Sequence, residues 1–291
     1  MSAIIKSIRT DAFVFRWLVE EQGYEWAKGS DSEQRLVARV PESRILLYEP
    51  LRVDGMFLEF ARLKDEDGIL QFANKHGGLF DTYGPKDWVS RGGKVEQGSS
   101  LKKWRSEIGE LHALVQIWEA ITDRNVRALK SIITWNAKGV RYEIKTPKYV
   151  KRAWLAHPDL NENTLARFKP QDVLLPAQYA LQAEINCRIA DPEYLSADEK
   201  PAIVPRLIWS PGRMPDNEKP PRPDHHQRII FEPTNLLAAM WLQFAQATTG
   251  QYQLKRCQGC GRYFQVGPGG RRADAKTCRD ACRQRSHRRG A

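Results

Sequence analysis

The residues best suited to chemistry are four cysteines near the end of the chain. Two residues separate Cys257 from Cys260, three separate Cys278 from Cys282, and seventeen lie between the pairs. Zinc prefers four tetrahedral ligands and binds thiolates well, and two short chelating turns joined by a longer connection can supply them. The spacing therefore predicts one structural Zn2+ ion, with these four cysteines as its ligands.

Each half of this site predicts a local structure. The first cysteine pair, followed by Gly261, is typical of a zinc knuckle, because glycine permits the backbone to point its amides at the sulfurs. Tyr263 and Phe264 are expected to begin a strand beside the metal. The glycines and proline of residues 267–275 indicate a hairpin turn. The second pair, at positions i and i+4, falls on one face of a helix. Together these features predict a treble-clef-type finger.

Other chemistry for the four cysteines stays open at this point. They could be reduced structural residues without a metal, form a disulfide, or hold an iron–sulfur cluster, although arginine-rich surroundings disfavour the cluster. His287 could replace one cysteine as a ligand. Cys187 is remote in sequence and is expected to be an inert thiol.

The positive charge of the chain is concentrated around these cysteines. Of a formal net charge of +11, residues 251–291 carry +9, from eleven basic and two acidic side chains. Arginine suits phosphate because its planar fork donates two hydrogen bonds at once. The pattern predicts contact with nucleic acid and by itself does not separate DNA from RNA. A solvated basic surface or one that binds an acidic protein is the alternative. The candidate contacts are Arg262, Arg271, Arg272, Lys276, Arg279, Arg283, Arg285, Arg288 and Arg289.

The elements that must position this site belong to an α+β fold. We expect a mainly helical body with a few short strands in residues 1–250, and a basic four-cysteine finger in residues 251–291. The clearest helix covers residues 100–122, where apolar residues recur at steps of three and four. Residues 78–97 are expected to form a loop. Further helices are expected at 54–63, 69–76, 124–135, 172–189 and 234–248, and strands within 34–49, 138–147, 206–210 and 226–232.

The start of the chain bears on its compartment. Lys6, Arg9, Asp11 and Arg16 interrupt the region where a signal peptide would have its apolar centre. No segment approaches the ~18 uncharged apolar residues that span a bilayer. We therefore expect a cytoplasmic protein with no membrane partner, in a reducing compartment where clustered cysteines usually bind metal. A homo-oligomer stays open.

No catalytic constellation stands out in the sequence. There is no phosphate-binding Gly-Lys-Ser/Thr loop, nucleophile elbow or HExxH pair. His225 and His226 lie in a proline-rich segment and are expected to be solvated, with a second metal site or an acid–base centre as the alternatives. His76, before two glycines, is expected at a helix C-terminus, where the dipole favours it. We assign no catalytic residue and favour a non-enzyme.

The end of the chain resembles the C-terminal zinc fingers of a broad group of bacterial proteins, including the CGNR-type finger. The family's Cys-Gly-Asn-Arg string appears here as Cys282-Arg283-Gln284-Arg285, without the Gly and Asn and with tighter cysteine spacings. The body segment FLEFARL…GILQFANKHGGL is similar to stretches found upstream of such fingers. The matching positions are Cys257, Cys260, Phe264, Cys278, Cys282 and Arg285.

This resemblance implies a bacterial DNA-binding protein that regulates transcription. Two hypotheses compete with it. In one, the finger is a structural zinc clip in a protein-interaction module. In the other, the chain is a nucleic-acid-processing effector whose catalytic residues lie in the body.

Overall fold

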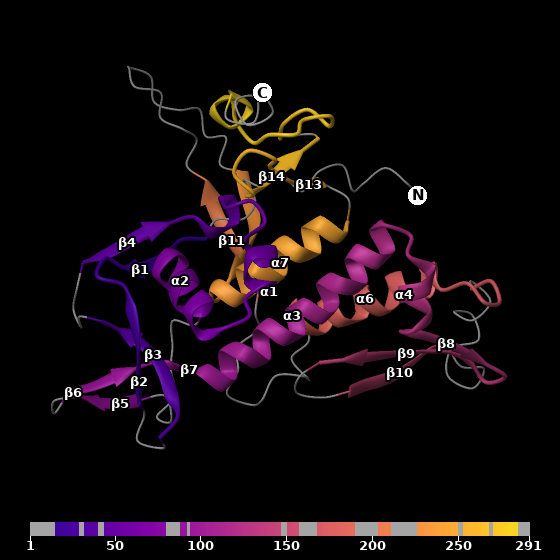
Figure 1. Ribbon diagram of the computed structural model, residues 1–291, viewed down its shortest axis with the longest axis horizontal. Coiled ribbons are helices and arrows are strands. Elements are labelled where there is room, and N and C mark those ends of the chain that lie inside the picture. Colours follow the sequence, from indigo (N-terminus) through magenta and orange to yellow (C-terminus); the bar gives the residue numbers. More distant parts are fainter. Residues whose placement is uncertain are drawn as a thin grey trace.

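The computed structural model places helices and short antiparallel strands in one α+β fold, which confirms the predicted class (Figure 1). Two-stranded and three-stranded sheets surround a group of packed helices. The structure describes residues 15–28, 32–39, 44–79, 88–91, 94–146, 150–156, 168–189, 203–210, 226–249, 253–267 and 270–284.

Several helices begin at a polar capping residue. Asp65, Ser100 and Asn235 each accept a hydrogen bond from the backbone N–H three residues later, at 2.8, 3.2 and 2.8 Å. Such a bond satisfies one of the amides that a helix start leaves without a partner. The helices are η2 (Pro50–Arg52, a 3-10 helix), α1 (Met56–Ala61), α2 (Glu66–His76), α3 (Leu101–Thr122), α4 (Val126–Lys130), α6 (Leu174–Ile189) and α7 (Leu236–Thr248).

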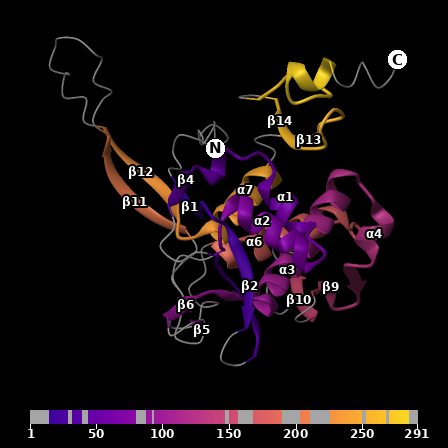
Figure 2. The same cartoon turned by 60° about the vertical axis from the view of Figure 1, so that its left-hand side comes forward.

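The strands form small sheets rather than one continuous sheet. β1 (Trp17–Glu20) pairs with β4 (Ile45–Tyr48). The other sheets are β2 (Tyr24–Lys28), β3 (Gln34–Ala38) and β7 (Ser99–Ser100); β5 (Trp88–Arg91) and β6 (Lys94–Gln97); β8 (Ile133–Asn136), β9 (Gly139–Lys145) and β10 (Val150–Ala156); β11 (Ile203–Ser210) and β12 (His226–Pro233); and β13 (Gln253–Arg256) and β14 (Tyr263–Val266). Figure 2 shows the β11–β12 ribbon extending away from the body.

The core is centred on α3, as its apolar periodicity predicts. Trp104 and Leu111 are fully buried, and α3 packs against α1 and α6. α7 adds Trp241 and Phe244, and the ring of Phe244 lies 5.3 Å from that of Phe57 on α1. α1 and α7 are thereby fixed to each other. They are also the helices nearest the finger in both views (Figures 1 and 2).

Two expectations about local structure were wrong. The expected loop at 78–97 contains the β5–β6 hairpin, whose strands flank Gly92 and Gly93. The expected helix at 124–135 is α4, which ends at Lys130, and β8 then begins at Ile133. There Ile133 and Trp135 alternate with exposed Thr134 and Asn136, a period of two over only four residues. No helix in the described ranges is long and apolar enough to cross a membrane.

Candidate metal centre

The four cysteines of the sequence motif converge on one point. The Sγ atoms of Cys257, Cys260, Cys278 and Cys282 all lie within 4.8 Å of one another. Cys278 Sγ is 3.6 Å from the sulfurs of both Cys260 and Cys282, far longer than a disulfide bond. Four sulfurs bound at ~2.3 Å to one tetrahedral centre would be ~3.8 Å apart. The arrangement is therefore that of a site able to hold a metal ion.

The first half of the site is a tight turn at the tip of the β13–β14 hairpin. Cys257 N–H donates to Arg262 O at 2.8 Å, and Gly261 N–H donates to Cys257 O at 2.8 Å. Gly261 has φ +73, in the left-handed region that glycine adopts without strain, as the knuckle requires. The strands that carry the turn thus hold the first two sulfurs in place.

The second half begins just before a short helical turn at residues 280–284, which contains Cys282. The backbone N–H of Cys278 points at the sulfur of Cys257 at 3.3 Å, so the two halves also contact each other directly. Gly259 lies between them, and a Cβ on Gly259 would be 2.5 Å from Cys282 O. Only glycine lets the knuckle and the helical turn approach this closely.

The expected position of the hairpin needs correction. Among the described residues of the finger, the paired strands are β13 and β14, which enclose the knuckle, and no second paired strand follows the turn expected at 267–275. The backbone after β14 instead turns back on itself, where Arg271 N–H donates to Gln265 O at 2.9 Å and Gly267 N–H donates to Arg271 O at 2.8 Å. Arg271 Nε then donates to Cys278 O at 3.0 Å. This connection brings the second cysteine pair back to the first.

The surroundings of the sulfurs affect how readily each thiol ionises. Burial alone would raise the pKa of Cys257, but the amides of Cys278, Cys260 and Gly259 outweigh it and lower the pKa to about 6. The guanidinium of Arg279 lowers the pKa of Cys282. Burial and the neighbouring sulfurs raise the pKa of Cys278. Amides and a cation directed at sulfur stabilise thiolates, the form that binds metal.

The basic residues expected to bind nucleic acid lie on the outside of the finger. Arg262, Arg271, Arg272, Lys276, Arg279 and Arg283 are all exposed. Three of these side chains lie near carboxylates. The guanidinium of Arg272 is 3.3 Å from the carboxylate of Asp274, and those of Arg271 and Arg283 are 3.7 and 3.6 Å from the carboxylate of Asp280. The remaining candidates, Arg285, Arg288 and Arg289, fall outside the described residues, as does His287.

β14 connects the metal centre to the body because its side chains alternate between two environments. Phe264 and Val266 are buried against the cysteines, whereas Tyr263 packs against the core of the body. The expectation that Tyr263 lies beside the metal is therefore wrong. Its ring lies under Arg62, whose Cζ is 5.1 Å from the ring centroid. Arg62 is itself held by Glu119 of α3 at 2.6 Å.

The body surface under the finger is the turn at Asp54 and Gly55, just before α1. Gln265 N–H donates to Asp54 Oδ2 at 3.2 Å. Burial raises the pKa of Asp54, and the hydrogen bond from Gln265 offsets only part of that rise. Gly55 has φ +70, and a Cβ there would lie 2.5 Å from Tyr263 Cβ. The turn therefore fits closely against β14.

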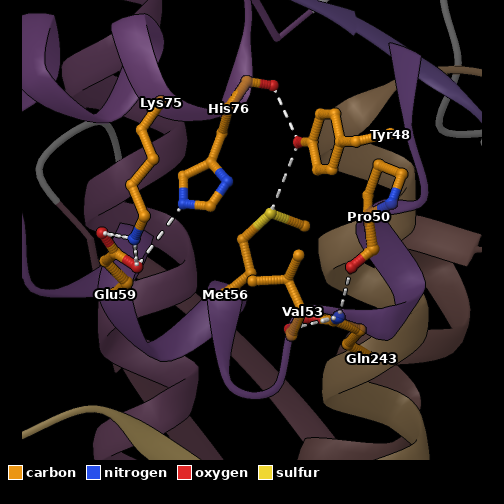
Figure 3. A network of polar contacts seen from close by, with 8 residues as sticks. All are labelled: Tyr48, Pro50, Val53, Met56, Glu59, Lys75, His76 and Gln243. Atoms are coloured by element: carbon orange, nitrogen blue, oxygen red, sulfur yellow. Dashed lines mark hydrogen bonds and ion pairs between the residues drawn. The ribbon is translucent and has the colours of Figure 1, made fainter.

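α7 supports this turn through hydrogen bonds to the residues that precede it. The side-chain amide of Gln243, which is buried, donates to Pro50 O at 3.0 Å and to Val53 O at 2.9 Å (Figure 3). Because only residues 249–252 separate α7 from β13 in the sequence, the same helix lies next to both the finger and the turn on which the finger rests. Nothing in the sequence pattern pointed to Asp54, Gly55 or Gln243, since each acts through a partner distant in sequence.

A second set of contacts in Figure 3 holds α1 to α2 and β4. Tyr48 Oη donates to His76 O at 2.8 Å. Lys75 Nζ lies 2.7 Å from the Glu59 carboxylate, and His76 Nε2 lies 3.5 Å from it. Burial alone would raise the pKa of Glu59, but His76 and Lys75 outweigh it and lower the pKa to about 2. His76 ends α2, as expected, and is buried rather than poised at an open cleft.

No family model matches the chain, and no curated protein or solved structure is significantly similar to it. The four-cysteine site therefore stands on its own geometry.

Proposed function

We propose that this chain is a bacterial, cytoplasmic DNA-binding regulator of transcription, whose finger holds one zinc ion and contacts duplex DNA. The observation that carries the proposal is the convergence of four sulfurs inside a shell of exposed basic side chains.

Zinc is the ion that the ligand set favours. Four thiolates in a closed tetrahedral set are typical of structural zinc, which has no redox chemistry of its own. The finger is small, and among its described residues the buried apolar side chains beside the cysteines are Phe264 and Val266. A module of this size usually needs a metal to fold, because its core cannot offset the loss of chain entropy.

The surface of the finger favours a polyanion. A divalent ion with four thiolates carries a net charge of roughly −2, which lies inside the finger and offsets only part of its basic charge. The exposed bases remain on the outside, and arginine suits phosphate. Asp274 and Asp280 pair with three of them in the free protein, and DNA phosphates would compete for the same guanidinium groups.

Attachment to the body gives the finger a defined orientation. Tyr263 and Gln265 contact the turn before α1, so these contacts hold the basic surface against the body. The same interface favours a second candidate function, in which zinc simply clips the end of the chain to the body and the bases bind an acidic protein. In that case duplex DNA would have no special affinity.

The experiment is a titration of labelled duplex DNA by fluorescence anisotropy at several salt concentrations. Binding through phosphates makes log affinity fall linearly with log salt. Lys276→Ala with Arg283→Ala should weaken binding and reduce that slope by about 2, one per lost phosphate contact. Lys102→Ala with Arg105→Ala removes two exposed charges from α3 and should leave the affinity unchanged. Equal effects of the two pairs, or no binding at low salt, would refute the DNA proposal.

A further inference from the structure

The body has a second exposed surface that carries basic and aromatic side chains. It is the outward face of the β8–β9–β10 sheet, which we call the sheet face. The inward face packs against α6 (Figure 1). Burial alternates along β9, where Val140, Tyr142 and Ile144 are buried and the residues between them point outward. The sheet face comprises Thr134, Asn136, Arg141, Glu143, Lys145, Val150, Arg152 and Trp154.

The inward face is held firmly, so the outward face is a stable platform. Tyr142 Oη donates to Glu184 of α6 at 2.5 Å. Lys151 Nζ lies 2.8 Å from the same carboxylate, which is buried. These contacts join the central strand β9 and the edge strand β10 to α6. The outward side chains are not needed to satisfy any of these buried groups.

The sheet face carries two partly exposed apolar side chains. Trp154 is 37% exposed and Val150 is 49% exposed. The residue opposite Trp154 on β9 is Arg141, and the residue opposite Arg141 on β8 is Thr134, so one row crosses all three strands. An exposed tryptophan on a sheet, with an arginine beside it on the next strand, is the kind of surface on which an unpaired nucleobase can stack.

The charge of the face is positive. Arg141, Lys145 and Arg152 are exposed, and Glu143 is the one acid among the sheet-face residues. Glu143 lies 2.6 Å from Arg152 and 3.4 Å from Lys145, so its charge is already compensated. Arg141, beside Trp154, has no acid of this face opposite it. A polyanion complements this face, whereas an acidic peptide would use its charge but not its ring.

We propose that the sheet face binds single-stranded nucleic acid, with a base stacked on Trp154 and phosphates near Arg141 and Lys145. A three-stranded sheet face is wider than the helix or two-stranded ribbon that a duplex groove admits, whereas a single strand can present its bases to it. This surface is separate from the finger, so the proposal does not depend on the function proposed for the finger.

The experiment uses the full-length chain and a labelled oligothymidine by anisotropy at low salt. Trp154→Leu should weaken binding about tenfold, because it keeps the apolar bulk but loses the stacking ring. Trp154→Phe should retain most of the affinity. Arg141→Gln should weaken binding and reduce the salt slope by about 0.7, while the charge-matched control Lys102→Gln should not.

Each contrary outcome has a clear meaning. Equal affinities for the Leu and Phe variants would overturn base stacking. Equal competition by polyglutamate and unlabelled oligonucleotide would show a merely electrostatic surface and overturn the proposal. A concentration-dependent dimer that is seen by light scattering and abolished by Trp154→Leu would also overturn the proposal. Because Trp154→Leu could lower stability, melting curves accompany it, and Arg141→Gln tests the same surface at an exposed position.

The design also separates this proposal from that of the finger. The Trp154 comparison is repeated in a chain that also carries Lys276→Ala and Arg283→Ala. The ratio of oligothymidine affinities between Trp154→Leu and Trp154→Phe should stay the same. If the finger changes fail to affect duplex binding while the Trp154 ratio persists, the finger proposal fails and the sheet-face proposal stands. If the two Trp154 variants bind equally well while duplex binding still depends on the finger, the sheet-face proposal fails and the finger proposal stands.

Discussion

Gly55 and Tyr263, 208 positions apart in the chain, are in direct contact, and a Cβ on Gly55 would lie 2.5 Å from the Cβ of Tyr263. Around this contact, Gln265 bonds to Asp54 and Arg62 covers the tyrosine ring. The metal centre is on the other side of the same strand, at Phe264 and Val266. One strand thus links the cysteines to the body.

Replacement of Gly55 by alanine should separate the finger from the body. The new Cβ would overlap Tyr263, and the φ of +70 would cost about 1–2 kcal/mol in a residue with a side chain. We expect faster hydrogen exchange in β13–β14 and earlier proteolysis between α7 and the finger. Gly267→Ala is the matched control, since Gly267 has φ +98 but nothing within 4 Å of a Cβ. Identical behaviour of the two variants would mean that the close contact with Tyr263 is unimportant.

Metal binding should depend on all four clustered cysteines and not on the fifth. The purified chain should contain about one zinc ion, and Cys257→Ser or Cys282→Ser should lose it, because a closed structural site uses four ligands. Cys187→Ser should keep the metal, since Cys187 lies on α6. Elemental analysis by mass spectrometry checks this. Full metal content in either ligand variant would exclude the assigned ligand set.

Gly259→Ala should weaken metal binding without removing a ligand. The added Cβ would lie 2.5 Å from Cys282 O and would push the two halves of the site apart. We expect an affinity loss of about tenfold or more, comparable with the loss of a group that orients a metal ligand. Competition with a chromogenic chelator measures it. Wild-type affinity would show that the knuckle and the helical turn can separate at no cost.

The Glu59 carboxylate, which is held by His76 and Lys75, should contribute to stability in a way that depends on pH. The pKa of Glu59 is lowered from 4.5 to about 2, so its contribution is complete above pH ~4.5 and is lost as the pH falls toward 2. Because the carboxylate is partly exposed, solvent screening limits it to about 1 kcal/mol or less. Urea denaturation of the wild type and Glu59→Gln between pH 7 and 3 should give a difference that shrinks with acid. Acid also releases thiolate-bound metal from both proteins, so only this difference is informative. A constant difference would refute the assignment.

The sequence predicted the parts of the fold whose signals are local. The stripe from Leu101 to Val115 defined α3, and the apolar runs around Leu207 and Ile229 predicted the β11–β12 pairing. The four cysteines were found because their spacing is tight. β8 was missed because four alternating residues following a helical segment carry too short a period to recognise.

What could not be predicted depends on contacts between distant segments. The bond from Gln265 to Asp54 joins residues 211 apart, and neither residue type signals such a role. The position of the finger hairpin was wrong because the glycines of 267–275 resemble a hairpin turn, whereas the strands enclose the knuckle. The sheet face required the register of Trp154 against Arg141, which only the structure provides.

The central claim is that a metal-dependent finger binds DNA. The most direct measurement is duplex binding by the full-length chain at low salt, before chelation, after removal of metal, and after zinc is restored. We predict binding that is lost on chelation and recovered with zinc, in parallel with the loss of affinity in Cys257→Ser. Duplex affinity that is unaffected by chelation, in protein confirmed to have lost its metal, would contradict the account.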